Sequence, residues 1–255
     1  MRLLFAELQK IRTAPRTTLG IVLGLLLLVG LGSAATASDA DSSAFAREMA
    51  TWDVVRVTSI AAIFTLILGI LVVTWEYRHG TITQTFLVTP RRERVIGAKF
   101  AVSFLVGAVL TAVAVGLALV VAVFWISLDL EREHWELAGR MLFGAALWGV
   151  LGAGLGALLQ SQVGAIVTSF VWFLVAEPLL GVTLEALTDR EFDDYFPGSV
   201  LDRLQGAGAV EVGVGDIVSG PDYPYGLWTA ALLATAYAVV FAALGIASAV
   251  RRDVP

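Results

Sequence analysis

The sequence predicts an all-α integral membrane protein with six transmembrane helices. Of its 255 residues, 58% are hydrophobic and only 15% are charged, and the mean hydropathy of +0.82 is well above that of a soluble domain. Six apolar runs are each long enough to cross a bilayer, at about 17–37, 56–75, 95–128, 138–159, 163–184 and 226–250. We therefore expect a single transmembrane domain over residues 1–255.

The first sixteen residues predict an amphipathic helix that lies on the membrane surface before the first span. Its apolar side chains recur at helical spacing and are Met1, Leu4, Phe5, Leu8 and Ile11. A basic start, an apolar run and Ala35-Thr36-Ala37 also resemble an export signal with a cleavage site. Sixteen residues before the apolar run are long for a signal, and their amphipathic pattern favours a retained first span.

The polar segment 76–94, between the second and third spans, predicts a short surface helix. Thr81 and Gln84 have the spacing of a capping box, so this helix should begin after Gly80. Its apolar members should be Ile82, Phe86 and Leu87. A short helix between two spans is an element on which a partner protein can push.

Pro90 should end this short helix, because a proline disfavours helical geometry in the residue before it. Thr89 and Pro90 also fit the cap and first position of a new helix, which would run through Arg94 into the third span.

The second half of the chain contains a short acidic loop at 129–136, a fourth span with a glycine-rich face, and a tight turn at 160–162. The glycines are Gly149, Gly152, Gly154 and Gly156, and they suit either packing within the bundle or a subunit interface.

Glu177 lies within the fifth span, where Glu177-Pro178 should interrupt the helix. A carboxylate at this depth is costly and is therefore a candidate for a transport role. The alternative is structural: a helix broken by proline would let Glu177 reach water or an unpaired backbone amide. Segment 185–225 is long and acidic, and its small apolar pieces suit short re-entrant helices.

Most of the lysines and arginines fall on one side of a six-span topology. They occur before the first span, between the second and third spans, and after the sixth span, in Arg2–Arg16, Arg78–Lys99 and Arg251–Arg252. The positive-inside rule makes this side cytoplasmic. We therefore expect a multi-pass protein of the cytoplasmic membrane, with both termini and segment 76–94 inside and segment 185–225 outside.

Motifs for catalysis and for cofactor binding are missing from the sequence. It contains no GxxxxGK[ST] phosphate loop, no HExxH and no GxSxG, and the absence of cysteine removes thiolate chemistry. The two histidines, His79 and His134, fall on opposite sides of the predicted membrane. The sequence therefore favours a transport role over an enzyme and predicts no metal, no cofactor in this chain and no nucleic-acid partner.

The chain resembles the permease subunit of a type-2 ABC exporter. The resemblance covers the whole chain in topology, and its residue motif is confined to the central segment. The motif consists of Glu76, Gly80-Thr81, Leu87, Thr89-Pro90, Arg94 and Lys99.

The resemblance implies a half-transporter that pairs with a second permease, identical or not, and with two copies of a separately encoded ATPase that holds ATP and Mg²⁺. It implies that 76–94 holds the coupling helix that contacts the ATPase, that the N-terminal helix is an elbow helix, and that segment 185–225 holds re-entrant helices. Substrates would leave between the permease copies and belong to the drug, peptide, lipid or polysaccharide classes.

Two other functions fit the residues. In an ion-coupled secondary transporter, Glu177 would carry the proton, although such proteins commonly show matching broken helices in both halves and this chain shows one in the second half only. A membrane scaffold or sensor without transport is the other alternative.

Overall fold

The computed structural model describes Glu7, Gln9 and residues 15–38, 57–88, 91–126, 132–188, 192–206 and 224–251. All regular elements in these residues are helical. Six helical runs are long and apolar enough to cross a membrane, and they are Thr18–Thr36, Val57–Arg78, Arg92–Phe124, Arg132–Leu159, Gln162–Thr188 and Leu227–Arg251. The predicted all-α fold with six spans is confirmed.

The first half of the chain supplies α2 (Pro15–Ser38), α4 (Ala61–Arg78), α5 (Ile82–Val88) and α6 (Arg92–Val121). A 3₁₀ turn at Val57–Ile60 precedes α4, and a π-helical turn at Ala122–Ile126 extends α6. The N-terminal surface helix predicted over 1–16 lies outside the described residues, except for Glu7, Gln9 and the first two residues of α2.

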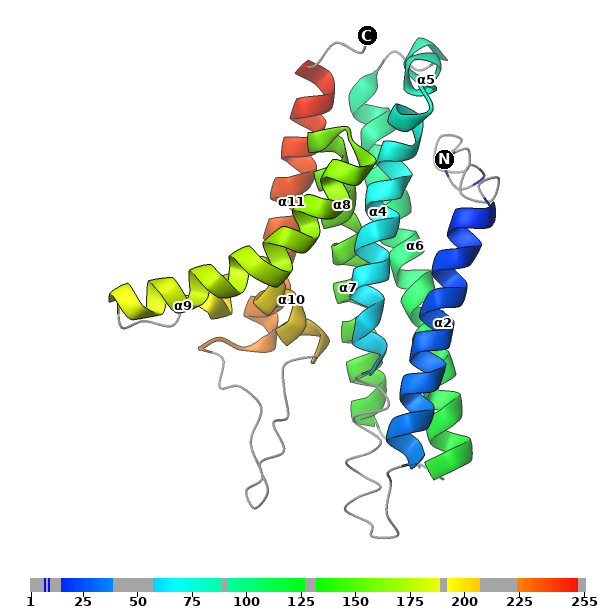
Figure 1. The fold of residues 1–255 in the computed structure, drawn as a ribbon, viewed down its shortest axis with the longest axis vertical. Coiled ribbons are helices and arrows are strands. Elements are labelled where there is room, and N and C mark those ends of the chain that lie inside the picture. Colours follow the sequence, from blue (N-terminus) through cyan, green and yellow to red (C-terminus); the bar gives the residue numbers. More distant parts are fainter. Residues whose placement is uncertain are drawn as a thin grey trace.

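The second half supplies α7 (Arg132–Leu159), α8 (Gln162–Val171), α9 (Glu177–Thr188), α10 (Pro197–Gln205) and α11 (Leu227–Arg251). A π-helical turn at Trp172–Ala176 joins α8 and α9 into one run, the α8–α9 arm (Gln162–Thr188). Helix α2 begins and α11 ends at the end of the bundle that carries α5, which we call the α5 end (Figure 1).

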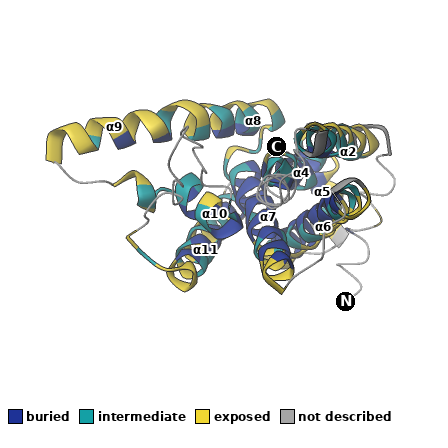
Figure 2. Ribbon diagram, turned by 90° about the horizontal axis from the view of Figure 1, so that it is seen from below, coloured by how far each residue is buried: buried dark blue, intermediate teal, exposed yellow. Residues whose placement is uncertain are grey.

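Helix α7 lies at the centre and packs against α4, α6, α10 and α11 (Figure 2). Its glycines permit close contact: a Cβ on Gly149 would lie 2.7 Å from the Ser103 carbonyl oxygen of α6, and one on Gly152 would overlap the Leu66 carbonyl of α4. Backbones approach this closely only where no side chain intervenes. The glycine-rich face of the fourth span thus serves packing within the bundle.

The α8–α9 arm is mostly exposed, in contrast to α7. Within the most apolar window of each run, 17% of the arm is buried against 67% of α7. Figure 2 shows α9 extending away from the bundle with exposed residues along most of its length. Because its exposed side chains are largely apolar, this surface suits lipid or another protein copy rather than water.

Several predicted helix boundaries were wrong. Helix α7 begins at Arg132, so most of the expected loop 129–136 is helical, where Arg132 Nε and Glu136 Oε1 pair at 2.8 Å across one turn. Helix α4 continues to Arg78 and so includes Glu76. Helix α6 begins at Arg92 rather than Pro90, because Arg91 has a non-helical ψ of 87°.

The predicted interruption at Pro178 takes the form of a π-helical turn, and the fifth span continues beyond its predicted end to Thr188. Proline has no N–H to donate, and its ring crowds the carbonyl four residues earlier, which here belongs to Leu174. The wider π turn at Trp172–Ala176 contains that position, so the helix accommodates the proline without ending.

Helix α10 lies beside the bundle helices, not beyond their ends (Figure 1). Val200, Leu201 and Leu204 pack in one core cluster with residues of α4, α7 and α11. The turn before α10 is tied to α11 because the Tyr237 hydroxyl donates to the Tyr195 carbonyl at 2.7 Å. A short helix expected in segment 185–225 is therefore present, and it packs on the core.

Candidate functional site

Helix α5 is held against the bundle at one end and exposed near the other. Gly80 adopts a φ of 66°, which glycine reaches without steric cost, and the Thr81 amide then donates to the Glu76 carbonyl at 3.0 Å. Ile82 is 2% exposed and packs with residues of α4, α6, α7 and α11. Leu87 is 77% exposed. Helix α5 is thus anchored by Ile82 and presents Leu87 outward.

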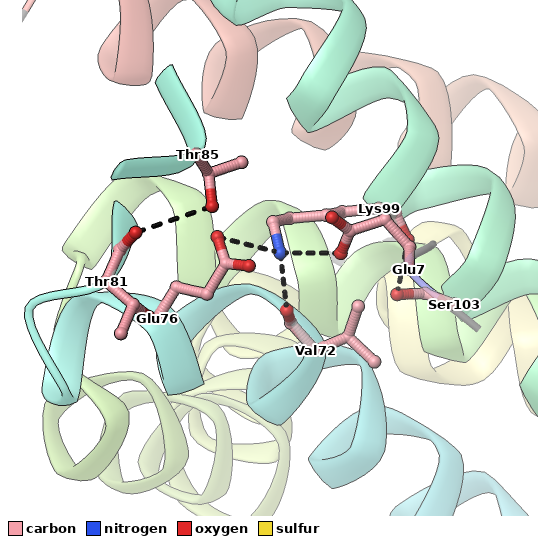
Figure 3. A network of polar contacts seen from close by, with 7 residues as sticks. All are labelled: Glu7, Val72, Glu76, Thr81, Thr85, Lys99 and Ser103. Atoms are coloured by element: carbon pink, nitrogen blue, oxygen red, sulfur yellow. Dashed lines mark hydrogen bonds and ion pairs between the residues drawn. The ribbon is translucent and has the colours of Figure 1, made fainter. Parts of the chain in front are cut away.

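A buried charge cluster, formed by Glu7, Glu76 and Lys99, lies at the α5 end (Figure 3). The Lys99 ammonium donates to Glu7 Oε2 at 2.8 Å and to the Val72 carbonyl at 3.2 Å, and it lies 3.3 Å from Glu76 Oε2. Lys99 is 1% exposed, and both glutamates are also buried. Charged groups from the N-terminal segment, α4 and α6 therefore meet at one point that is closed to solvent.

Because the three charged side chains are buried, they are stable only while they remain paired with one another. Removing an ion from water costs several kcal/mol, and a close partner and hydrogen bonds must offset that cost. Lys99 has both, since two carboxylates and a backbone carbonyl surround its ammonium. Displacing α6 would remove the ammonium that both carboxylates share, and displacing either of the other two segments would remove one of the two carboxylates that surround Lys99. The cluster therefore holds the start of the chain, α4 and α6 together.

Of the residues predicted for the coupling segment, Glu76 alone belongs to this cluster. Gly80 forms the turn before α5. The others are exposed (Thr81, Leu87 and Arg94), within α5 (Phe86), or outside the described residues (Thr89 and Pro90).

Sequence reasoning named Lys99 only as part of the family motif, and it missed both Glu7 and the buried contact between the two residues. Lys99 lies inside the apolar run predicted for the third span, and an ionisable residue there is a functional candidate by the same rule that selected Glu177. Glu7 is the only acidic residue among the first 38 residues. These two signals together would have indicated a buried pair.

Glu177 lies on α9, far along the chain from the charge cluster, and is 6% exposed. Its Oε1 accepts hydrogen bonds from the amides of Gly198 at 2.7 Å and Ser199 at 3.2 Å. These amides belong to the first turn of α10, which has no intrahelical acceptors for them and carries a partial positive charge. Glu177 therefore meets unpaired backbone amides, as one of the two interpretations expected, but the amides are those of α10.

A cavity of about 750 Å³ lies beside Glu177, between α4, α7, the α8–α9 arm and α10. Glu177, Trp148 and Phe173 are among the residues that line it. Within the described part of the chain, no group of three His, Asp or Glu side chains is placed to hold a metal ion.

A family model described as ABC-2 family transporter protein matches residues 3–177. The matched region is more than half of the chain and includes α5, Glu177 and the whole buried charge cluster. No curated protein matches the chain.

Proposed function

The chain belongs to the ABC-2 family of transporter proteins, which makes it a permease subunit of an ABC transporter, and we propose that it exports its substrate with energy from a separate ATPase. In this proposal, ATP and Mg²⁺ bind to the ATPase, because the chain has no phosphate loop. The α5 end faces the cytoplasm, where the positive-inside rule places the arginines around α5.

The observation that carries the proposal is the position of α5 relative to the buried charge cluster. Helix α5 is joined to α4 by the turn 79–81 and to α6 by residues 89–91. Lys99 and Glu76 link the same ends of α6 and α4 to each other. A force on α5 would therefore move both spans together as a rigid unit, which is the motion that an ATPase has to produce.

Two permease copies and two ATPase copies would form the transporter. The α8–α9 arm supports this assembly, because its apolar exposed face is available to a second permease copy. We favour ATP-driven export over ion coupling through Glu177, since Oε1 of Glu177 is engaged by the amides of α10.

Leu87→Asp tests the contact with the ATPase. An aspartate on the exposed face of α5 should prevent docking in an apolar cleft, because the charge would lose its hydration there. The matched control is Trp135→Asp, since Trp135 is 58% exposed and lies in the first turn of α7, outside both α5 and the α8–α9 arm.

The measurement is the amount of ATPase that co-purifies with tagged permease from native membranes. We expect loss of the ATPase with Leu87→Asp and wild-type recovery with Trp135→Asp, at equal permease levels. Wild-type recovery and wild-type export with Leu87→Asp would exclude α5 as the contact. A permease that retains no ATPase even without substitution would refute the proposed energy source.

A further inference from the structure

The cavity beside Glu177 has the size of a site for a small organic molecule. Its volume of about 750 Å³ lies in the range of roughly 300–1,000 Å³ that is typical of ligand sites. One wall comes from the first two turns of α4, including Ile63 and Leu66. The opposite wall comes from the α8–α9 arm and the start of α10.

Aromatic rings form part of the wall. Trp148 of α7 and Phe173 of the arm meet edge to face with their centroids 4.6 Å apart. Trp148 is 6% exposed, and its indole Nε1 has no hydrogen-bond partner among the described residues. Aromatic faces bind both apolar groups and cations, and tryptophan binds cations best.

The charged side chains in the lining are all acidic. Glu177 and Asp202 are joined by Glu185 and Asp193, and the lining contains no lysine, arginine or histidine. Glu177 is the buried member: Oε1 caps α10, the Trp172 side chain also interacts with the carboxylate, and Oε2 makes no hydrogen bond of normal geometry among the described residues. Neutral donors do not balance a full charge, so a buried carboxylate in a cavity wall that holds no basic side chain points to a ligand that brings a positive charge.

We infer that this cavity binds an amphipathic organic cation, which is the substrate class of the exporter; this inference rests on the proposed function. Apolar and aromatic walls bury the body of such a molecule, while Glu177 and the other acids stabilise its charge. The acidic lining would repel a phospholipid phosphate. A purely apolar ligand would leave the buried charge of Glu177 without a cation, which is costly at this burial.

The test compares two ions of the same shape and opposite charge, tetraphenylphosphonium and tetraphenylborate. Binding to the full-length permease in phosphatidylcholine nanodiscs is measured by equilibrium dialysis, with empty nanodiscs subtracted. We expect saturable binding of tetraphenylphosphonium alone.

Two neutralising variants locate the binding to this cavity. Glu177→Gln should weaken binding of tetraphenylphosphonium by about tenfold or more, because the carboxylate is buried. Asp202→Asn should weaken it by about threefold, because Asp202 is exposed and its charge is screened. Asp202→Asn leaves the cap of α10 intact, so it still tests the inference if Glu177→Gln fails to fold. The matched control, Glu136→Gln, lies outside the cavity and should bind as wild type does.

Equal binding of the two ions, or wild-type affinity in both variants, would overturn the inference. A phospholipid that co-purifies in the cavity and is not displaced by tetraphenylphosphonium would also overturn it. The binding measurement needs no ATPase, so its failure is separable from failure of the proposed function. A permease that retains its ATPase but does not bind tetraphenylphosphonium keeps its proposed function and loses this substrate class.

Discussion

Substituting Lys99 tests whether the buried charge cluster holds the α5 end together. Lys99→Met keeps a long unbranched side chain and removes the ammonium that lies between two buried carboxylates. Glu7 and Glu76 would then remain buried and lose the ammonium that lies between them. The start of the chain should pack less firmly on α4 and α6, because the ammonium that joined Glu7 to both helices is gone.

The expected cost follows from the burial of the cluster. Breaking a buried ion pair by removing one partner costs roughly 3–5 kcal/mol, because the remaining charge is left uncompensated. A typical stability of about 5–15 kcal/mol would lose a large fraction of its value. A triple variant with Lys99→Met, Glu7→Met and Glu76→Met removes every charge and should recover most of the loss, since replacing a buried ion pair by apolar residues of similar volume is often neutral or stabilising.

The assay is reversible unfolding of the permease in mixed micelles, followed by tryptophan fluorescence. Lys99→Met should have the lowest free energy of unfolding. The triple variant should have a higher one, up to that of the wild type. ATPase stimulation by substrate should be lost in Lys99→Met to a greater extent than ATPase binding. A Lys99→Met permease within about 0.5 kcal/mol of wild type, or a triple variant no better than the single one, would refute the assigned role of the cluster.

Further predictions address packing, topology and coupling. In the same unfolding assay, Gly152→Ala should destabilise the bundle by roughly 1–3 kcal/mol, because its methyl group would overlap the backbone of α4. Its control is Gly116→Ala, which has open space around it and should be neutral or stabilise the bundle by up to about 1 kcal/mol. In intact cells, a single cysteine at Thr83 should resist an impermeant thiol reagent and one at Glu133 should react with it; the reverse pattern would invert the topology. Glu177→Gln should raise the KM for a cationic substrate while export stays dependent on ATP; export driven instead by a proton gradient, and lost in this variant, would favour a secondary transporter.

The number of spans and their approximate positions could be predicted because they depend on a local property. A run of about twenty apolar residues is enough to indicate a span, whatever its neighbours are. The boundaries at Arg78 and Arg132 could not be predicted in this way, because charged residues continue both helices past the apolar runs. The apolar run ends where charged residues begin, whereas the helix ends where its backbone hydrogen bonds end.

The candidate site was harder to predict because its residues are distant in sequence. Glu7 and Lys99 are 92 residues apart, and nothing in the local pattern of either residue indicates the other. Glu177 was identified from its depth in the fifth span. Its partners Gly198 and Ser199 could not be identified, because hydropathy does not determine where segment 192–206 lies in the fold. Individual ionisable residues within spans can thus be found from sequence, and their partners require the tertiary structure.

Helix α4 connects the two sites physically. Glu76 near its last turn belongs to the buried charge cluster, and Ala62, Ile63 and Leu66 near its first turns line the cavity. The helix is α-helical throughout Ala61–Arg78 and packs along α7 through glycine contacts, so it has little room to bend. If the ATPase displaces α5, the Glu76–Lys99 pair makes α4 and α6 follow, and the cavity wall formed by α4 has to move relative to the α8–α9 arm. The same helix therefore gives one route by which ATPase closure would change the affinity of the cavity for its ligand.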